Sequence, residues 1–114
     1  MSGLLSKVAA YTAALNRYDL GAVEQMFAAD AIYVSPGLGG EVKGRAAIIA
    51  AFREYFRQHT DQVNTDENVQ QIDGHRLQSR WHLKSAKSSR SGRQRMTFTE
   101  TGLITRIEVE DDAE

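Results

Sequence analysis

The side chains of this chain that are able to do acid–base or metal chemistry are few and far apart. No two of the three histidines, His59, His75 and His82, have the spacing of a metal-ligand pair. None of them is expected on the inner surface of the fold beside a serine, which argues against a Ser-His-Asp arrangement. We therefore predict no metal site, and no residue pattern indicates a cofactor.

One tyrosine and two carboxylates are better candidates for chemistry. Tyr11 lies on the apolar face of a helical pattern and should point inward. Glu67 and Glu100, together with the amide of Gln71, fall in segments where alternation does not settle which residues face inward. An inward carboxylate that aromatic side chains desolvate has a raised pKa, which suits acid or base catalysis.

Three helices are expected in the first half of the chain. The first closes at residues 16–18, and its apolar face consists of Leu4, Val8, Tyr11, Thr12 and Leu15. Asp19 caps the second, which runs to about Ala29 and has a face made of Leu20, Val23 and Phe27. The third spans residues 45–59, and its apolar stripe consists of Ile48, Ile49, Phe52, Tyr55 and Phe56.

Strands follow, because apolar and polar residues alternate from about Gln62 onward. A bulge is expected within residues 63–72. The inward residues of the later segments are Leu77, Ser79, Trp81 and Leu83, then Gln94, Met96 and Phe98, and finally Leu103, Thr105, Ile107 and Val109. Ile32 and Val34 form an earlier short strand that the glycines of residues 37–40 break into a loop. Helices followed by antiparallel strands are typical of an α+β fold with the helices on one face of a single sheet.

Size and charge restrict the class of protein. At 114 residues and 41% hydrophobic composition, residues 1–114 form a single domain with one core. The formal net charge of -1 gives no positive field that would attract nucleic acid or an anionic membrane. There is no cysteine, and the first residues lack the order of a signal peptide. A cytoplasmic protein without a membrane segment is the expectation.

The basic run in residues 84–95 has two interpretations. It surrounds a Ser-Gly-rich turn and resembles a phosphate or RNA patch. However, a hairpin at Thr101-Gly102 would set Arg95 opposite Glu108 and Arg93 opposite Glu110, where each pair contributes about 0.2–1 kcal/mol. Since the strands carry no exposed aromatics for base stacking, we favour a solvated or interface surface over a nucleic-acid site.

Four short segments carry a resemblance to a known superfamily. They are residues 10–12 (AYT), 18–19 (YD), 24–31 (EQMFAADA) and 43–45 (KGR). In these segments the chain resembles the bacterial ketosteroid isomerases and the SnoaL-like polyketide cyclases of the nuclear transport factor 2 (NTF2)-like superfamily. The resemblance implies a cone-shaped, cystatin-like α+β fold in which three N-terminal helices pack on a curved, mainly antiparallel sheet. It also implies a homodimer formed through the outer sheet face.

The resemblance implies three catalytic positions. Tyr11 matches the tyrosine that donates a hydrogen bond to the developing oxyanion, Ser35 stands where the isomerases have an aspartate base, and Gln94 stands where they have a protonated aspartic acid. A serine cannot accept a proton at neutral pH without a base of its own, and losing a general base typically lowers the rate by about 10²–10⁴. We therefore do not expect steroid isomerisation by that mechanism, but Tyr11 and Gln94 would make a pair of neutral donors for a carbonyl or enolate oxygen.

Each of these sites also has a purely structural interpretation. Tyr11 would then be a core residue whose hydroxyl bonds a backbone carbonyl, and Ser35 an ordinary turn residue before proline. The predicted cavity lining either walls a pocket or fills the cone, with Tyr33 and the loop of residues 37–40 at its rim. This lining consists of Leu15, Phe27, Tyr33, Phe52, Phe56, Trp81, Met96 and Phe98.

The sequence thus supports two functional hypotheses. The first is a protein that binds a small hydrophobic molecule, including an isomerase, cyclase or lyase that acts on a carbonyl compound. The second is a non-catalytic association module with a filled cone and a working outer sheet face. Whether the chain is an enzyme stays open at this point.

Overall fold

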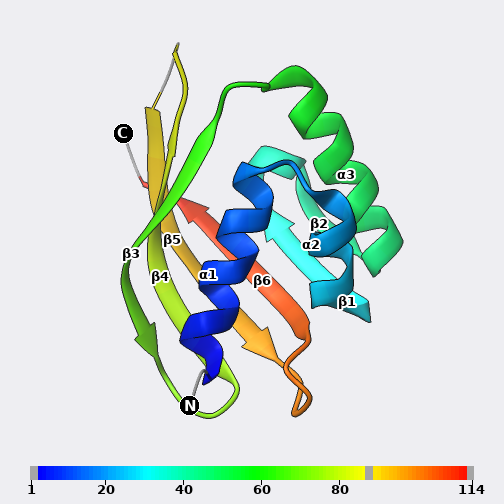
Figure 1. Ribbon diagram of the computed structural model, residues 1–114, viewed down its shortest axis with the longest axis vertical. Coiled ribbons are helices and arrows are strands. Elements are labelled where there is room, and N and C mark those ends of the chain that lie inside the picture. The colour runs from blue at the N-terminus through cyan, green and yellow to red at the C-terminus, as the bar shows by residue number, and fades with distance from the viewer. Residues whose placement is uncertain (1–2, 87–88, 113–114) are drawn as a thin grey trace.

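Three α-helices pack against one six-stranded sheet in the computed structural model, which describes residues 3–86 and 89–112 (Figure 1). The helices are α1 Gly3–Asn16, α2 Leu20–Met26 and α3 Arg45–Gln58, with a short 3-10 helix η1 Pro36–Leu38. The strands are β1 Phe27–Ser35, β2 Gly40–Lys43, β3 Val63–Gln71, β4 Arg76–Lys84, β5 Ser89–Phe98 and β6 Ile104–Asp111. This is the α+β arrangement that the change from helical to alternating periodicity predicts.

The sheet has the order β2-β1-β6-β5-β4-β3, and every neighbouring pair is antiparallel except β1 and β6. In Figure 1 the sheet curves around the helices: α1 crosses one half of it, over β3 and β4, while α2 and α3 lie beside the half that holds β1 and β2. The inner face of the sheet and the three helices therefore enclose the core.

The first helix is tied to the far edge of the sheet by side chains. The Asn16 side-chain oxygen accepts a hydrogen bond from the backbone N–H of Asn64 (2.7 Å), and its amide donates to the Asn64 carbonyl (2.9 Å). One helical turn earlier, the Thr12 hydroxyl donates to the carboxylate of Asp66. Residues at i and i+4 share a helix face, and residues at i and i+2 share a strand face. The helix residues Thr12 and Asn16 therefore contact the strand residues Asp66 and Asn64 respectively, along the same side of α1.

The second helix is shorter than its apolar pattern predicts. Asp19 caps it as expected, accepting a hydrogen bond from the N–H of Ala22 (3.2 Å). The helix ends at Met26, not at about Ala29, because Phe27 is already extended and pairs with Ile104 at the start of β1. Phe27 is fully buried, as its apolar side chain predicts, but it belongs to strand β1 and not to the predicted helix.

The glycine-rich segment also differs from the prediction. A loop was expected over residues 37–40, but Gly40–Lys43 forms strand β2, which pairs antiparallel with residues 32–35 of β1. Gly39 and Gly40 have φ values of 85° and 116°, a region that favours glycine, and they allow the tight return of the chain. The two glycines therefore make a hairpin possible and do not end the sheet at this edge, which corrects the predicted loop.

The hairpin of β5 and β6 has the predicted pairing. Arg93 lies opposite Glu110 and Arg95 opposite Glu108, as expected. A register shift between Thr97 and Phe98 alters the pairing near the turn. As a result Ile104 and Ile107 are buried, while the predicted inward Leu103 and Thr105 are only half-buried. Val109 faces inward as predicted, since it packs against the core and lines the cavity described below.

Strand β3 contains the bulge that its irregular pattern indicates. The register with β4 shifts between Glu67 and Gln70, and Asn68 has a φ of 52°. Before the bulge, Asn64 and Asp66 face inward, and Asp66 lies opposite the inward Trp81. A regular ladder counted back from the β3–β4 turn would have placed Glu67 opposite Trp81. Because of the bulge, Asp66 and not Glu67 lies on the inner face.

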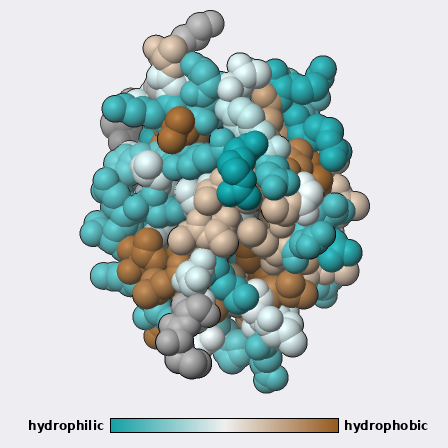
Figure 2. All heavy atoms as spheres, in the orientation of Figure 1, coloured by the Kyte–Doolittle hydropathy of each residue, from teal (hydrophilic) through white to brown (hydrophobic). Residues whose placement is uncertain are grey.

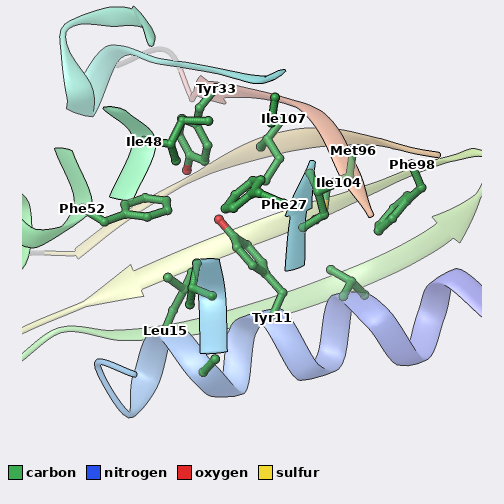
Figure 3. Packing of buried hydrophobic residues seen from close by; sticks show 14 of the residues in the cluster. Tyr11, Leu15, Phe27, Tyr33, Ile48, Phe52, Met96, Phe98, Ile104 and Ile107 are labelled. Carbon is green, nitrogen blue, oxygen red and sulfur yellow. The ribbon is translucent and has the colours of Figure 1, made fainter. Parts of the chain in front are cut away.

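One cluster of buried side chains fills most of the space between helices and sheet (Figure 3). Tyr11 meets the ring of Phe27 edge-on at 6.0 Å, and Tyr33 meets Phe52 in the same way at 5.1 Å. Such edge-to-face pairs stabilise a core by about 0.5–1.5 kcal/mol beyond the area they bury. In the view of Figure 2, hydrophilic residues cover most of the surface and apolar residues form small patches. Among the described residues no helix is long and apolar enough to cross a membrane.

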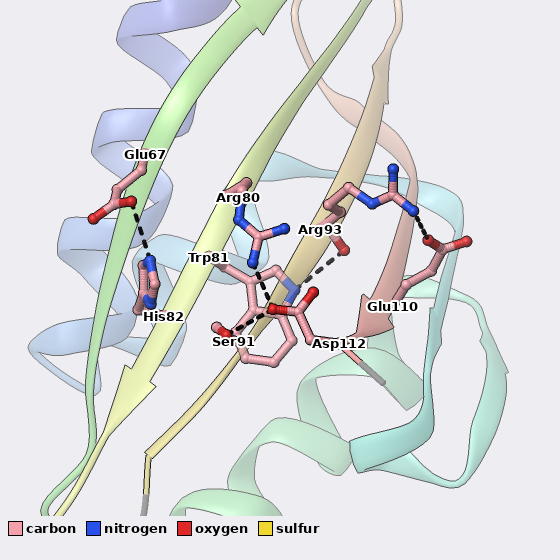
Figure 4. Close-up of polar contacts among 8 residues, drawn as sticks. All are labelled: Glu67, Arg80, Trp81, His82, Ser91, Arg93, Glu110 and Asp112. Carbon is pink, nitrogen blue, oxygen red and sulfur yellow. Dashed lines mark hydrogen bonds and ion pairs between the residues drawn. The ribbon is translucent and has the colours of Figure 1, made fainter. Parts of the chain in front are cut away.

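The basic run lies partly on the outer face of the sheet. Arg93 and Arg95 are exposed there, while Lys87 lies outside the residues that the structure describes. Arg93 contacts Glu110 at 3.4 Å, and Arg80 is paired with Asp112 (Figure 4). Of the arginines in the basic run, Arg90 and Arg93 are paired with Asp111 and Glu110 of β6, whereas Glu108, opposite Arg95, bonds Arg106 of its own strand.

A glycine in β5 makes room for the single tryptophan. A Cβ atom on Gly92 would overlap the backbone carbonyl oxygen of Glu110 and lie 2.8 Å from Cζ2 of Trp81. We expect Gly92→Ala to lower the free energy of unfolding by about 2–3 kcal/mol, because the pairing of β5 with β6 holds the Glu110 backbone that the new methyl group would overlap. Urea unfolding monitored by tryptophan fluorescence measures this loss.

Gly74→Ala is the matched control for this substitution. No atom lies within 4 Å of the Cβ that alanine would place at Gly74. It should leave the free energy of unfolding within about 0.5 kcal/mol of that of the original chain. Equal stability of the two variants would contradict the close packing of Trp81 on Gly92.

Candidate functional site

A cavity of about 90 Å³ lies between α1, α3 and the inner face of the sheet. An enclosed cavity of about 150 Å³ accommodates benzene, so the enclosed part of this cavity suits only a small group. Residues from all parts of the fold line it: Tyr11, Thr12, Leu15, Tyr33, Ser35, Leu38, Phe52, Tyr55, Phe56, Asn64, Asp66, Trp81, Leu83, Arg90, Gln94, Val109 and Asp111. The cavity is therefore apolar on much of its wall and polar at particular points.

The hydroxyl of Tyr11 is buried and has no hydrogen-bond partner. It does not bond a backbone carbonyl, as the structural interpretation of this residue requires. Figure 3 shows the Tyr11 hydroxyl rising from α1 toward the space that the Tyr33 hydroxyl also faces. The two phenols lie close enough that a hydroxyl–hydroxyl interaction between them shifts the pKa of each, although its geometry falls short of a normal hydrogen bond. A buried hydroxyl without a partner costs about 1–3 kcal/mol, which a ligand oxygen at this point would offset.

Both phenols remain protonated over the whole range in which the protein would work. Burial raises the pKa of Tyr11 well above its ordinary value of 10.0, and the neighbouring Tyr33 adds to this effect. Burial also raises the pKa of Tyr33 to about 12. Each phenol is therefore a permanent hydrogen-bond donor. The predicted position of Tyr33 at the rim is wrong, since this residue is buried beside Phe52.

Asp66 on β3 provides a carboxylate in the cavity wall that the sequence interpretation missed. It accepts hydrogen bonds from the Thr12 hydroxyl and from the amide of Gln94, the latter at 3.1 Å. Burial raises its pKa above the ordinary value of 3.8, and the two hydrogen bonds partly oppose this shift. An aspartate with a raised pKa is a stronger base than one in water, which is the property that proton transfer requires.

The role of Gln94 differs from the predicted one. Its side-chain nitrogen donates to Asp66 and, at 3.2 Å, to the hydroxyl of Ser79. A primary amide has two N–H donors, so these contacts use both of them. Gln94 therefore holds Asp66, and it has no donor left for a ligand oxygen. The side chain that shares the cavity wall with Tyr11 as a second hydroxyl donor is Tyr33 and not Gln94.

The remaining polar candidates separate into those inside and outside the cavity. Ser35 is buried at the end of β1 and lines the cavity. Glu67 faces the outer surface, where its carboxylate lies 3.1 Å from His82 (Figure 4). Glu100 is exposed in the β5–β6 turn, and the exposed Gln71 donates to the carbonyl of Asp73 at 3.0 Å. Neither glutamate therefore lines the cavity, whereas Asp66 does.

The predicted apolar lining also divides into two groups. Leu15, Tyr33, Phe52, Phe56 and Trp81 line the cavity. Phe27, Met96 and Phe98 are buried in the adjoining core and do not reach the cavity wall.

No group of three or more His, Asp or Glu side chains in residues 3–86 and 89–112 comes together in a way that could hold a metal ion. Of the signals present in the sequence, the bulge in β3 was the one that could have identified Asp66. Identifying Asp66 in this way would have required the exact position of the bulge, which lies between Glu67 and Gln70.

Comparisons with known proteins place this geometry among related folds. Residues 8–111 match the model of the SnoaL-like domain family. A protein of unknown function with a cystatin-like fold from Methylobium petroleophilum is 18% identical, with a TM-score of 0.84 over 97% of this chain and 76% of that one. These matches agree with the cone-shaped NTF2-like fold that the resemblance implies. No protein with a curated description matches the chain.

Two further structures are similar and carry functional descriptions of their own. A Mycobacterium tuberculosis protein in complex with estradiol-17β-hemisuccinate is 16% identical, with a TM-score of 0.74 over 93% of this chain and 91% of that one. The epoxide hydrolase/cyclase-like enzyme SalBIII, which has a role in pyran ring formation in salinomycin, is 19% identical. Its TM-score is 0.79 over 92% of this chain and 87% of that one.

The raised pKa of Asp66 predicts a specific dependence of stability on pH. Because the folded-state pKa lies above the unfolded value of about 3.8, the folded protein binds more protons than the unfolded chain between these two values. Stability contributed by this group is thus present at low pH and is lost as the pH rises through the folded-state pKa. Asp66→Asn abolishes this titration. The free energy of unfolding of the original chain, relative to that of Asp66→Asn, should fall as the pH rises through this window.

Two measurements check this prediction. Urea unfolding of both proteins over a pH series gives the stability difference, and carbon NMR of the Asp66 carboxyl gives its titration midpoint directly. A midpoint at or below 3.8, with a stability difference that does not change with pH, would show that Asp66 is well solvated.

Proposed function

We propose that this chain, which belongs to the SnoaL-like domain family, binds a small apolar carbonyl compound beneath its sheet and catalyses proton transfer at the carbon next to the carbonyl. The observation that carries this proposal is the unpartnered buried hydroxyl of Tyr11 in the same cavity wall as the carboxylate of Asp66. One group suits an oxygen that gains negative charge, and the other suits removal of a proton.

The proposed reaction begins with the carbonyl oxygen at Tyr11, with Tyr33 as the second donor. Asp66 removes a proton from the neighbouring carbon: the C–H bond breaks, its electron pair forms a C=C bond to the carbonyl carbon, and the C=O π pair moves to the oxygen to give an enolate. The charge of Asp66 lies near enough to raise the pKa of Tyr11, so the two groups share one site electrostatically. Return of the proton to a different carbon gives isomerisation. Attack of the enolate carbon on a second carbonyl group of the same molecule closes a ring: a C–C bond forms, the π bond of that carbonyl breaks, and its oxygen takes the proton held by Asp66.

The rate accelerations typical of a general base and of an oxyanion donor support these roles for Asp66 and Tyr11. A positioned general base typically accelerates a reaction by about 10²–10⁴. One well-placed oxyanion donor contributes about 10²–10³ more. Thr12 donates to Oδ2 of Asp66 and Gln94 donates to Oδ1, so the two hydrogen bonds fix the orientation of the carboxylate. The steroid ester bound by one similar protein and the ring closure linked to another support a carbonyl-containing or cyclising substrate.

Exchange of carbon-bound hydrogen for deuterium tests this function without knowledge of the natural substrate. Incubated with 2-pentanone or cyclopentanone in D₂O, the protein should accelerate deuterium incorporation next to the carbonyl, as followed by proton NMR. Asp66→Asn should lower this acceleration by about 10²–10⁴ because it removes the base. Tyr11→Phe should lower it by about 10²–10³ because it removes the oxyanion donor.

Glu67→Gln is the matched control, since it removes the adjacent carboxylate on the opposite face of the same strand. It should leave the exchange rate unchanged. The proposal fails if neither ketone exchanges faster than in buffer, or if Glu67→Gln and Asp66→Asn slow the exchange equally.

The association module remains a second candidate because the outer sheet face carries exposed side chains of both signs, and the Arg93–Glu110 contact within the chain is long, at 3.4 Å. Arg80, Arg93 and Arg95 lie on β4 and β5, and Glu108 and Glu110 lie on the adjoining β6. These residues line a surface groove of about 260 Å³. In a two-fold dimer each positive stripe can lie against the negative stripe of the partner. We propose that a homodimer forms on this face.

Analytical ultracentrifugation tests the homodimer. Arg80→Glu places a negative charge in the positive stripe and should raise the dimer dissociation constant by at least about tenfold. Gln70→Glu at the edge of the same groove is the control for a change of charge alone. A monomer at all concentrations, or equal effects of both variants, would contradict the proposed interface.

A further inference from the structure

The outer end of the cavity carries an ion pair that the proposed proton transfer does not use. Arg90 on β5 and Asp111 at the end of β6 both line the cavity, and the guanidinium donates a hydrogen bond to the carboxylate. Their side chains are 38% and 34% exposed, so the pair lies at the boundary between the cavity and solvent. Arg90 is the only cation among the described residues that line the cavity.

Several contacts hold the guanidinium over the cavity. Arg90, Gly92 and Gln94 alternate onto the inner face of β5, while Arg93 faces outward. The Arg90 guanidinium lies 5.9 Å from the centre of the Trp81 ring. That ring is fixed in turn by its N–H, which donates to the carbonyl of Arg93 at 3.1 Å, and by its packing on Gly92. A cation over a fixed indole ring loses little freedom when it binds an anion.

The guanidinium retains donors beyond those that Asp111 uses. Within the described residues, the hydrogen bond to Asp111 involves one of its terminal nitrogens, Nη2. A guanidinium carries five N–H donors in a planar fork that matches a carboxylate. Asp111 thus occupies part of an anion-binding group that faces the cavity.

We infer that the ligand is a keto acid, with its carbonyl at Tyr11 and its carboxylate at Arg90. This inference rests on the proposed function for the carbonyl end and adds the chemistry of the other end. In the absence of ligand, Asp111 keeps the cation paired. The ligand carboxylate competes with Asp111 for the guanidinium, and the apolar chain between the two ends lies along Trp81.

The positions on β5 limit the length of such a ligand. Gln94, which holds Asp66, and Arg90 are four residues apart, or roughly 13 Å along an extended strand. The arginine side chain covers part of this span. A ligand with a short chain of methylene groups can therefore reach both ends, with only its carbonyl end in the small enclosed part of the cavity and its carboxylate at the half-exposed boundary. A compound as short as a 2-keto acid would not reach both ends.

A matched series of probes tests the inference. The affinities of 5-oxohexanoate, 6-oxoheptanoate and 7-oxooctanoate, each compared with its methyl ester, are measured by NMR titration or calorimetry. At least one acid should bind about tenfold more tightly than its ester, in keeping with a hydrogen bond to a charged group at a partly exposed site. Arg90→Gln should abolish that preference and leave the affinity for the ester unchanged.

Asp111→Asn provides a second and opposite test. It removes the internal competitor, so the affinity for the acid should rise severalfold while that for the ester stays the same. Arg93→Gln is the control for loss of one arginine from the same strand, because its side chain lies on the outer face. It should not alter the preference for the acid.

The outcomes separate this inference from the proposed function. If the esters bind in the cavity but no acid binds more tightly than its ester, the keto-acid inference is wrong while the proposed function stands. The inference is equally wrong if Asp111→Asn weakens binding of the acids, or if Arg93→Gln acts like Arg90→Gln. If neither acids nor esters bind, and the simple ketones do not exchange, both proposals are wrong.

Discussion

The attachment of α1 to β3 is the constraint on which the candidate site depends. The pairs Asn16 with Asn64 and Thr12 with Asp66 lie one helical turn and two strand residues apart, so they fix both the height and the rotation of the helix against the sheet. Tyr11 is adjacent to Thr12 and is therefore fixed in the same way. A rotation of α1 that broke these contacts would turn the Tyr11 hydroxyl from the cavity and release the carboxylate at once.

This arrangement explains how an acidic residue is tolerated inside a small core. Taking a carboxylate from water is costly, and the cost appears as the raised pKa of Asp66. The hydroxyl of Thr12 and the amide of Gln94 offset part of it, since hydrogen bonds to a charged group contribute about 1.5–3 kcal/mol each. Gln94 is oriented in turn by Ser79. The polar residues of the inner sheet face thus act as one connected group around a single charge.

The sequence predicted the fold better than the site, for physical reasons that particular residues illustrate. Helical and alternating periods are repeated over many residues, so one misplaced position, such as Phe27, does not change the architecture. A site depends on single positions. In β3 one bulge brings Asp66 inward and sends Glu67 outward. The alternation could reveal the irregularity of this strand but not its location. Similarly, Tyr33 is buried and does not lie at the predicted rim, since β2 extends the sheet beyond β1 and pairs with it at this position.

The distribution of satisfied and unsatisfied groups in the cavity favours binding over simple packing. Asp66, Gln94 and Ser79 have partners inside the protein, whereas the Tyr11 hydroxyl has none even though it is almost fully buried. A core selected only for stability would place phenylalanine at this position, because the ring would pack equally well without an unsatisfied hydroxyl. The phenol therefore carries a polar group that the neighbouring Tyr33 hydroxyl satisfies incompletely. Because its pKa is raised, it stays protonated and can donate a hydrogen bond, which suits the oxygen that becomes negative in the proposed reaction.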